Sequence, residues 1–245
     1  MVSHVLAPAD FDRLQRLDTC TASNAIERFD VRPRNEGFIR GTARCLFPAL
    51  PPTLGYAVTG RIRSSTQPVA RGWYYDRIEW WRYLQSVRSP RVMVLQDVDQ
   101  VPGFGAFMGE IHANIATALH CVGCVTNGAV RDLAPIEALG FQLFAGGVSP
   151  SHAYAHIVDW GQPVEIGGLR INSGDLVHGD RHGVQTVPLS VAADIPRVAV
   201  ELGRQERELI DLCRSPHFSV EALSEMFDHM RATHSASGIL PSSDQ

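Results

Sequence analysis

The sequence contains no lysine: all 22 of its basic residues are arginines. An enzyme that forms a Schiff base with its substrate, or that holds pyridoxal phosphate, needs a lysine amine, and so does a lysine-dependent phosphate-binding loop. These three classes are therefore excluded. Carbanion or enolate chemistry in this protein needs another electron sink, for which a metal ion is the obvious candidate.

Long apolar runs are also missing. No stretch reaches roughly 18 uninterrupted apolar residues, and the N-terminus lacks the cationic start and apolar run of a signal peptide. The five cysteines are odd in number and irregular in spacing, which indicates a reducing compartment rather than a disulfide framework. The formal charge of -4 supplies no global cationic field. We therefore expect a cytoplasmic protein that binds neither membrane nor nucleic acid.

The 245 residues, 44% of them hydrophobic, are enough for a sizeable core. The sequence pattern predicts helices at 6–17, 19–29, 71–87, 110–120 and 131–139, and strands at 37–49, 54–65 and 141–147. Residues 91–99, a short apolar run rich in valine, and residues 121–128 predict buried strands, and 103–109 predicts a glycine-punctuated loop. From residue 91 onward strands and helices alternate, which favours parallel strands joined by crossover helices. Residues 163–189 predict antiparallel hairpins, and 195–232 predict charged amphipathic helix. We expect an α/β domain at 1–194 and a C-terminal helical extension and tail at 195–245.

The segment GFGAFMGEIHANIA places a helix N-terminus directly after the glycine-rich loop. The amides and the positive dipole end of such a terminus form a ready site for an anion. Arg131 follows the next strand, and the carboxyl ends of neighbouring parallel strands meet at one edge of a sheet. If these two strands are neighbours, the helix N-terminus and the guanidinium grip one small carboxylate together.

Two acids fall at the same two places. Glu110 begins the helix after the loop, and Asp132 directly follows Arg131. Two carboxylates beside a bound oxyacid make a site for a hard cation such as Mg²⁺ or Mn²⁺. Each acid taken alone also has a structural explanation, because acids are common at N-caps and in the first turns of helices.

The stretch GEIHANIATALHCVGCVTNGAVRDL resembles the signature of the RraA-like family, with its Gly-acid-apolar start, small-residue helix and closing Gly-x-x-Arg-Asp. SGDLVHGDRHGVQTVP resembles that family's later hairpin, and ASNAIERF resembles its early helix. The resemblance covers residues from about 19 to 190. The family contains 4-hydroxy-4-methyl-2-oxoglutarate aldolases and oxaloacetate decarboxylases, and also the non-enzymatic regulator of ribonuclease activity A.

The resemblance implies a compact α-β-β-α, swivelling-type domain with mixed sheets. Such domains assemble as a ring-shaped trimer, or as a hexamer of two trimers, with the site at a subunit boundary. By match to the motif, Arg131 binds the pyruvyl carboxylate, Asp132 holds Mg²⁺ or Mn²⁺ directly or through water, and Glu110 acts near the metal-bound water and serves as a second acid at the ion.

The same match extends to backbone groups and to a neighbouring chain. The amides of Ile111 and His112, which follow Gly109, are expected on the substrate carboxylate. A glutamate from the C-terminal region of a neighbouring subunit, placed here at Glu206 or Glu208, is expected to complete the site.

The implied activity is a metal-dependent lyase reaction on small 2-oxo acids. Chelation of a 2-oxo acid through its carboxylate and keto oxygens lets a divalent ion stabilise the pyruvate enolate left by C–C cleavage. Retro-aldol cleavage and oxaloacetate decarboxylation share that enolate, and the absence of lysine agrees with this route. The alternative is a non-enzymatic regulator that docks on a ribonuclease or helicase, because a fold does not guarantee turnover. Methyl transfer to a quinone ranks last, since no glycine-rich loop follows a first strand.

One position departs from the family pattern. Asn127 stands where many members have an acid before the glycine, which leaves open whether metal binding is impaired. The nearby Cys121-x-x-Cys124 is half of a zinc motif, but its position in a predicted buried strand favours a structural role.

Other polar residues have structural explanations as well. His152 and His156 have metal-like spacing, but no third ligand is placed near them in the sequence. Asp175, Asp180 and His182 fit hairpin turns, whose conformations Asp and Gly supply. The aromatic residues between 73 and 83 predict core or a subunit interface.

Overall fold

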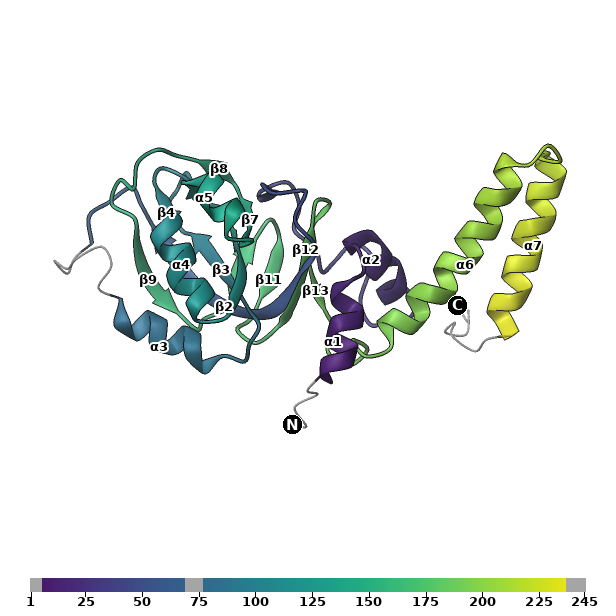
Figure 1. Cartoon of the computed structure of the whole chain (residues 1–245), viewed down its shortest axis with the longest axis horizontal. Coiled ribbons are helices and arrows are strands. Elements are labelled where there is room, and N and C mark those ends of the chain that lie inside the picture. Colours follow the sequence, from purple (N-terminus) through teal and green to yellow (C-terminus); the bar gives the residue numbers. More distant parts are fainter. Residues whose placement is uncertain (1–5, 69–76, 237–245) are drawn as a thin grey trace.

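A computed structural model describes residues 6–68 and 77–236 of the chain (Figure 1). The helices are α1 (Pro8–Gln15), α2 (Thr19–Glu27), α3 (Ile78–Ser86), α4 (Glu110–Ala118), α5 (Leu133–Ala138), α6 (Ile195–Arg214) and α7 (Val220–Ala236). The strands are β1 (Arg44–Cys45), β2 (Thr53–Arg63), β3 (Arg91–Asp97), β4 (Ala106–Met108), β5 (Cys121–Thr126), β6 (Ala129–Val130), β7 (Gln142–Ala145), β8 (Gly147–Val148), β9 (His156–Trp160), β10 (Val164–Ile166), β11 (Leu169–Ile171), β12 (Leu176–Asp180) and β13 (Gly183–Val187).

The main sheet is mixed, with the strand order β1-β7-β5-β3-β2-β12-β13 and with β9 paired to β2. Strands β2, β3, β5 and β7 are parallel to one another, whereas β1, β9 and β12 pair antiparallel. Helix α4 lies between β3 and β5 in the chain, and α5 lies between β5 and β7. The predicted parallel strands with crossover helices are confirmed, and so are the hairpins between 163 and 189.

The main sheet is covered on both faces, which explains why its central strands are apolar along their whole length. Side chains that alternate along a strand point to opposite faces. Met93 and Leu95 of β3 pack into a cluster with Trp80 of α3 and with α4 and α5, whereas Val92 and Val94 pack with the β10–β11 hairpin. The predicted strand 54–65 is confirmed as β2.

A second, small parallel sheet continues the main one. Its order is β4-β6-β8, and these strands follow β3, β5 and β7 along the chain. The prediction of a loop over the whole of 103–109 is therefore wrong for residues 106–108, which are buried and form β4. Three residues are too few for periodicity to distinguish a strand from a loop.

A third cluster joins the N-terminal helices to the C-terminal ones. Leu14 of α1 and Ile26 of α2 pack with Ile195 and Val198 at the beginning of α6. Beyond this contact α6 and α7 form a helical hairpin that projects from the α/β body (Figure 1). The mixed α/β fold with C-terminal helices is confirmed, while the boundary between residues 194 and 195 stays a prediction.

Two of the sequence predictions need correction or restriction. The strand predicted at 37–49 is wrong except for β1 and an isolated bridge from Phe38 to Gln185. The rest of the segment is irregular because its backbone changes partners: the Ile39 amide donates to Val184 of β13, whereas the Arg40 amide donates to Gly167. The helix predicted at 71–87 is described only as α3, where Trp80, Trp81 and Leu84 are buried; its beginning lies outside the described residues. None of the helices in the described ranges has the length and apolar character needed to span a bilayer.

Candidate active site

The small sheet places the ends of two strands side by side. Met108 of β4 pairs with Val130 of β6, and the Arg131 amide donates to the Met108 carbonyl at 2.9 Å. Gly109 follows β4 directly, and Asp132 follows β6 after Arg131. The N-terminus of α4 and the Arg-Asp pair therefore lie next to each other, as the sequence interpretation required.

Asp132 does not act as an ordinary cap of its own helix. It stands at the N-cap position of α5, in the left-handed region with φ 57°, but its side chain makes no cap hydrogen bond there. One carboxylate oxygen instead accepts from the Glu110 amide at 3.1 Å, and the other accepts from Arg131 Nε at 3.1 Å. The carboxylate thus lies at the N-terminus of α4, where the helix dipole favours negative charge.

These contacts keep Asp132 ionised. Its partial burial alone would raise the pKa, but the hydrogen bond from the Glu110 amide and the interaction with Arg131 outweigh that effect. The pKa of Asp132 is therefore lowered from its ordinary value. An ionised carboxylate is the form that a hard cation binds.

Gly109 lies very close to the Arg-Asp pair. A Cβ built at Gly109 would stand 2.7 Å from Oδ2 of Asp132 and 3.1 Å from Cγ of Arg131. The Asp132 carboxylate would have to shift to admit a side chain at this position. Glycine therefore permits the close approach of β4 and the Arg-Asp pair.

The three residues that open α4 have different surroundings. The Glu110 side chain is exposed, Ile111 is 51% exposed, and His112 is buried. The His112 ring lies between Phe107, at 5.0 Å between centroids, and Trp81, at 5.8 Å. Burial lowers the pKa of His112 to about 3, and the positive charge of Arg77 adds to this effect. The His112 imidazole is thus a neutral ring packed behind the site.

Sequence reasoning missed one residue near this place, His152. Its charge contributes to the lowered pKa of Asp132, and its Nδ1 lies 3.2 Å from the Ala106 carbonyl oxygen. The sequence predicts a structural role for His152, because neither an acid nor a third ligand stands near it in the sequence. The fold supplies that acid from the end of β6, and no local signal in the sequence could have revealed it. His156 keeps the structural interpretation, with its Nδ1 2.7 Å from the Tyr154 carbonyl oxygen.

The side-chain amide of Asn127 makes two hydrogen bonds to the Asp97 backbone, which explains why this position holds asparagine. Its Nδ2 donates to the Asp97 carbonyl at 2.9 Å, and its Oδ1 accepts from the Asp97 amide at 2.7 Å. The side-chain amide thereby joins the end of β5 to the end of β3. An aspartate could accept from the Asp97 amide but could not donate to its carbonyl.

The acids available for a cation at this place are few. In the described part of the chain, the one group of three His, Cys, Asp or Glu residues with ligand atoms within 4.8 Å of one another is Asp18, Cys20 and His182. Glu110 and Asp132 belong to no such group. Water, substrate oxygens or another chain would have to supply the remaining ligands of an ion held there.

Glu206 and Glu208 are not brought to this site within one chain. Both lie on α6, which stands toward the opposite end of the long axis from α4 (Figure 1). Glu206 accepts from Asn24 of α2 at 3.4 Å, and Glu208 pairs with Arg204. Their expected role through a neighbouring subunit stays a prediction.

The two cysteines of β5 behave as core residues. Cys121 and Cys124 are both buried, and burial raises the pKa of Cys121 to about 12 and that of Cys124 further. Protonated, buried thiols are poor metal ligands and poor nucleophiles. The structural interpretation of this pair agrees with the structure.

Comparison with known proteins finds one matching family model and a relative with a similar sequence. The RraA-like family model, described as Aldolase/RraA, matches residues 19–185. A Halalkalibacterium halodurans protein provisionally named a 4-hydroxy-4-methyl-2-oxoglutarate aldolase is 33% identical over 84 residues, which are 34% of this chain and 40% of that protein. The match thus spans less than half of that relative's length.

Two solved structures share the fold. An uncharacterized protein from Pseudomonas syringae pv. tomato is 23% identical with a TM-score of 0.69, and the match covers 90% of this chain and 94% of that one. Streptomyces coelicolor RraAS2, described as an unusual member of the RNase ES inhibitor RraA protein family, is 22% identical with a TM-score of 0.65, over 82% of this chain and 96% of that one. At these identities the likeness shows the fold alone.

Proposed function

Because the chain belongs to the RraA-like family, which includes both aldolases and RNase inhibitors, we propose that it is a divalent-metal-dependent lyase of small 2-oxo acids. The observation that supports this most is the meeting of Arg131, Asp132 and the first residue of α4 through the β4–β6 pairing. The absence of lysine requires an electron sink other than an imine, and carboxylates for a cation are present at this place.

In this proposal Arg131 binds the carboxylate of the substrate. Its Nε already donates to Asp132, which fixes the plane of the guanidinium. The terminal N–H groups of a guanidinium fit a carboxylate in two parallel hydrogen bonds. The amides of Ile111 and His112, in the first turn of α4, add donors and a positive dipole end to the same anion.

Asp132 and Glu110 are the residues that would hold the ion. Their oxygen donors suit Mg²⁺ or Mn²⁺, and the lowered pKa of Asp132 keeps one donor ionised. When bound, such an ion stabilises the enolate oxygen that C–C cleavage leaves on the pyruvyl fragment. The exposed Glu110 carboxylate is the group assigned to proton transfer at C3 of that enolate.

We propose further that the active form is a homo-oligomer, a trimer or a hexamer. The described residues of one chain place Glu110 and Asp132 at the site, and Glu206 and Glu208 lie on α6 away from it. A neighbouring chain could bring one of these glutamates to Asp132. Light scattering measures the oligomeric state directly, and a monomer with full activity would contradict this part of the proposal.

Pyruvate release tests the function. The protein is supplied with oxaloacetate or with 4-hydroxy-4-methyl-2-oxoglutarate, with and without added Mg²⁺ or Mn²⁺, and pyruvate is followed by a coupled assay. We expect metal-dependent release that Arg131→Ala lowers by more than about tenfold, because one bidentate carboxylate contact is removed. The matched control is Arg170→Ala, on the exposed edge of β11.

The alternative is a binding protein of the ribonuclease-regulator type. Absence of metal-dependent turnover on every 2-oxo acid tried, with equal behaviour of the wild type and Arg131→Ala, would overturn the lyase proposal and favour this alternative. If the wild type and Arg131→Ala then both capture a purified ribonuclease, the partner is a ribonuclease.

A further inference from the structure

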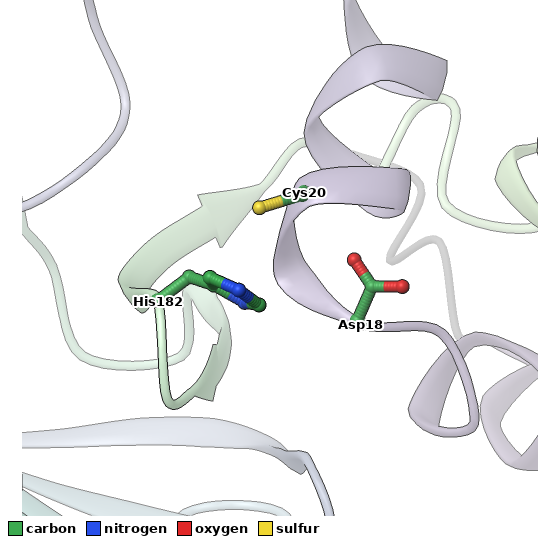
Figure 2. A group of neighbouring side chains, drawn as sticks. All are labelled: Asp18, Cys20 and His182. Atoms are coloured by element: carbon green, nitrogen blue, oxygen red, sulfur yellow. The ribbon is translucent and has the colours of Figure 1, made fainter. Parts of the chain in front are cut away.

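A second cluster of ligand-type side chains lies away from the candidate active site, and Figure 2 shows its three members. Asp18 is the N-cap of α2, Cys20 is in the first turn of that helix, and His182 stands in the turn between β12 and β13. One ligand atom from each residue lies within 4.8 Å of those of the other two. All three side chains are exposed, so an ion from solution can reach them.

A buried carboxylate joins the two segments that carry this cluster, the beginning of α2 and the turn between β12 and β13. Asp180, 5% exposed, accepts from the Thr19 amide at 2.9 Å and from the Thr19 hydroxyl. The same carboxylate accepts from the His182 amide at 2.8 Å. The beginning of α2 and the hairpin turn, separated by 161 residues between Thr19 and Asp180, are thereby fixed in position before any ion binds.

Asp180 also orients the imidazole. Nδ1 of His182 lies 3.2 Å from Oδ1 of Asp180. A neutral histidine that donates from Nδ1 to a carboxylate keeps its lone pair on Nε2, and this arrangement is the usual support of a histidine ligand in metal sites. Asp180 is not itself one of the three ligands, and its contact with Nδ1 orients the ring to bind a cation through Nε2.

The Asp18 carboxylate is held in a comparable way. Its two oxygens accept from the Thr21 amide and from the Thr21 hydroxyl, each at 2.8 Å. Each carboxylate oxygen has a second acceptor position, so capping the helix does not exhaust its capacity to bind a cation. Hydrogen bonds already present therefore favour one orientation for two of the three ligands.

We propose that Asp18, Cys20 and His182 bind a thiophilic divalent cation of the Zn²⁺ class. A thiolate, an imidazole and a carboxylate are the donors that Zn²⁺ takes in proteins, whereas Mg²⁺ prefers oxygen alone. With Zn–S near 2.3 Å and Zn–N near 2.0 Å, tetrahedral ligand atoms stand about 3.5 Å apart. Small rotations of exposed side chains bring atoms within 4.8 Å to that separation.

The fourth ligand position would face an adjoining pocket. The cavity has a volume of about 150 Å³ and is lined by residues of α2, of the chain before β1 and of β13, including Ser23, Phe38 and Val184. Water or a small anion fits there. When the cation binds, the Cys20 thiol releases its proton to water, and the ion joins α2 to the β12–β13 hairpin. Because the unfolded chain has no such site, binding stabilises the folded protein.

Cobalt substitution tests this site in the full-length protein. Titration with Co²⁺ should give a thiolate-to-cobalt charge-transfer absorption that saturates at one equivalent. Cys20→Ser should abolish it, while Cys213→Ser, at the other exposed cysteine of the described residues, should leave it unchanged. Glu110→Ala should also keep the absorption, because neither exposed cysteine of the described residues belongs to the candidate active site; the result is therefore independent of the lyase proposal.

Substitutions of His182 and Asp18 test the two remaining ligands. His182→Ala should weaken Zn²⁺ binding by more than about tenfold, and His217→Ala should not. Asp18→Asn retains a good N-cap for α2 and should also weaken binding, which keeps the test valid if another variant fails to fold. Zn²⁺ should raise the melting temperature of the wild type and of Cys213→Ser but not that of Cys20→Ser. No charge-transfer absorption in the wild type, or an equal one in Cys20→Ser, would overturn the proposal.

Discussion

The carboxylate of Asp132 accepts a hydrogen bond at 3.1 Å from the backbone amide of Glu110, which stands 22 residues earlier in the chain. The acid that precedes α5 therefore caps α4. This contact gives Asp132 a structural role, since an acceptor and a negative charge both stabilise a helix N-terminus. The proposed lyase function gives the same carboxylate a chemical role, and the two can be separated experimentally.

Asp132→Asn separates them, because an asparagine oxygen still accepts from the Glu110 amide but the charge is lost. We expect the free energy of unfolding, measured in urea, to change by less than about 1 kcal/mol. Metal-dependent kcat/KM should fall by more than about tenfold. Asp228→Asn on α7 is the matched control. Full activity in Asp132→Asn would show that the Asp132 charge is not needed to bind the ion.

Gly109→Ala tests the close approach behind that contact. The new methyl group would stand 2.7 Å from Oδ2 of Asp132, so the carboxylate must move away from α4. We expect kcat/KM to fall by about tenfold or more, since displacement of a positioned group by about 1 Å has such effects. Gly147→Ala, whose added Cβ meets nothing within 4 Å, is the control. Equal activity of both variants would contradict a requirement for this geometry.

Asn127→Asp tests why this chain departs from the family pattern. The substitution removes the donor to the Asp97 carbonyl and sets a carboxylate oxygen against it. We expect a loss of about 1–3 kcal/mol in the free energy of unfolding, from urea denaturation at neutral pH. Asn35→Asp, at an exposed position, should cost little. Tighter Mg²⁺ binding with unchanged stability would show instead that Asn127 lies at the ion site.

Stability should decrease as the pH falls below neutrality. Burial lowers the pKa of His112 to about 3 and that of His178 to about 4. In the unfolded chain both take up protons below about pH 6.5, whereas the folded protein holds them neutral, so folding loses up to about 1.4 kcal/mol per histidine for each pH unit. The loss runs from about pH 6.5 down to the folded pKa values.

Urea unfolding at pH 7.5, 6.5 and 5.5 would measure this slope. His112→Phe keeps an aromatic ring between Phe107 and Trp81 and should reduce the slope by about 1.4 kcal/mol per pH unit at most. His217→Phe, at an exposed histidine, should leave the slope unchanged. A slope of the same size in His112→Phe would mean that His112 is protonated in the folded protein.

Much of the fold follows from local pattern. The apolar runs that form β3 and β5 have the length and composition of buried strands, and the small-residue helix α4 has helical spacing. Glycine turns mark both hairpins between 163 and 189. The candidate residues Glu110, Arg131 and Asp132 were also found from the sequence, because their position after predicted strands and their chemistry are both local properties.

Tertiary structure decided what those residues touch. Strands β4 and β6 have two or three residues each, too few to show a period, yet their pairing is what brings Asp132 to α4. The pairing register between distant strands depends on packing of the whole core and is not written in any short segment. For the same reason the support of Asp97 by Asn127 and the approach of His182 to α2 appear only in the folded chain. The sequence by itself determined which chemistry is available, and the long-range contacts decided where it converges.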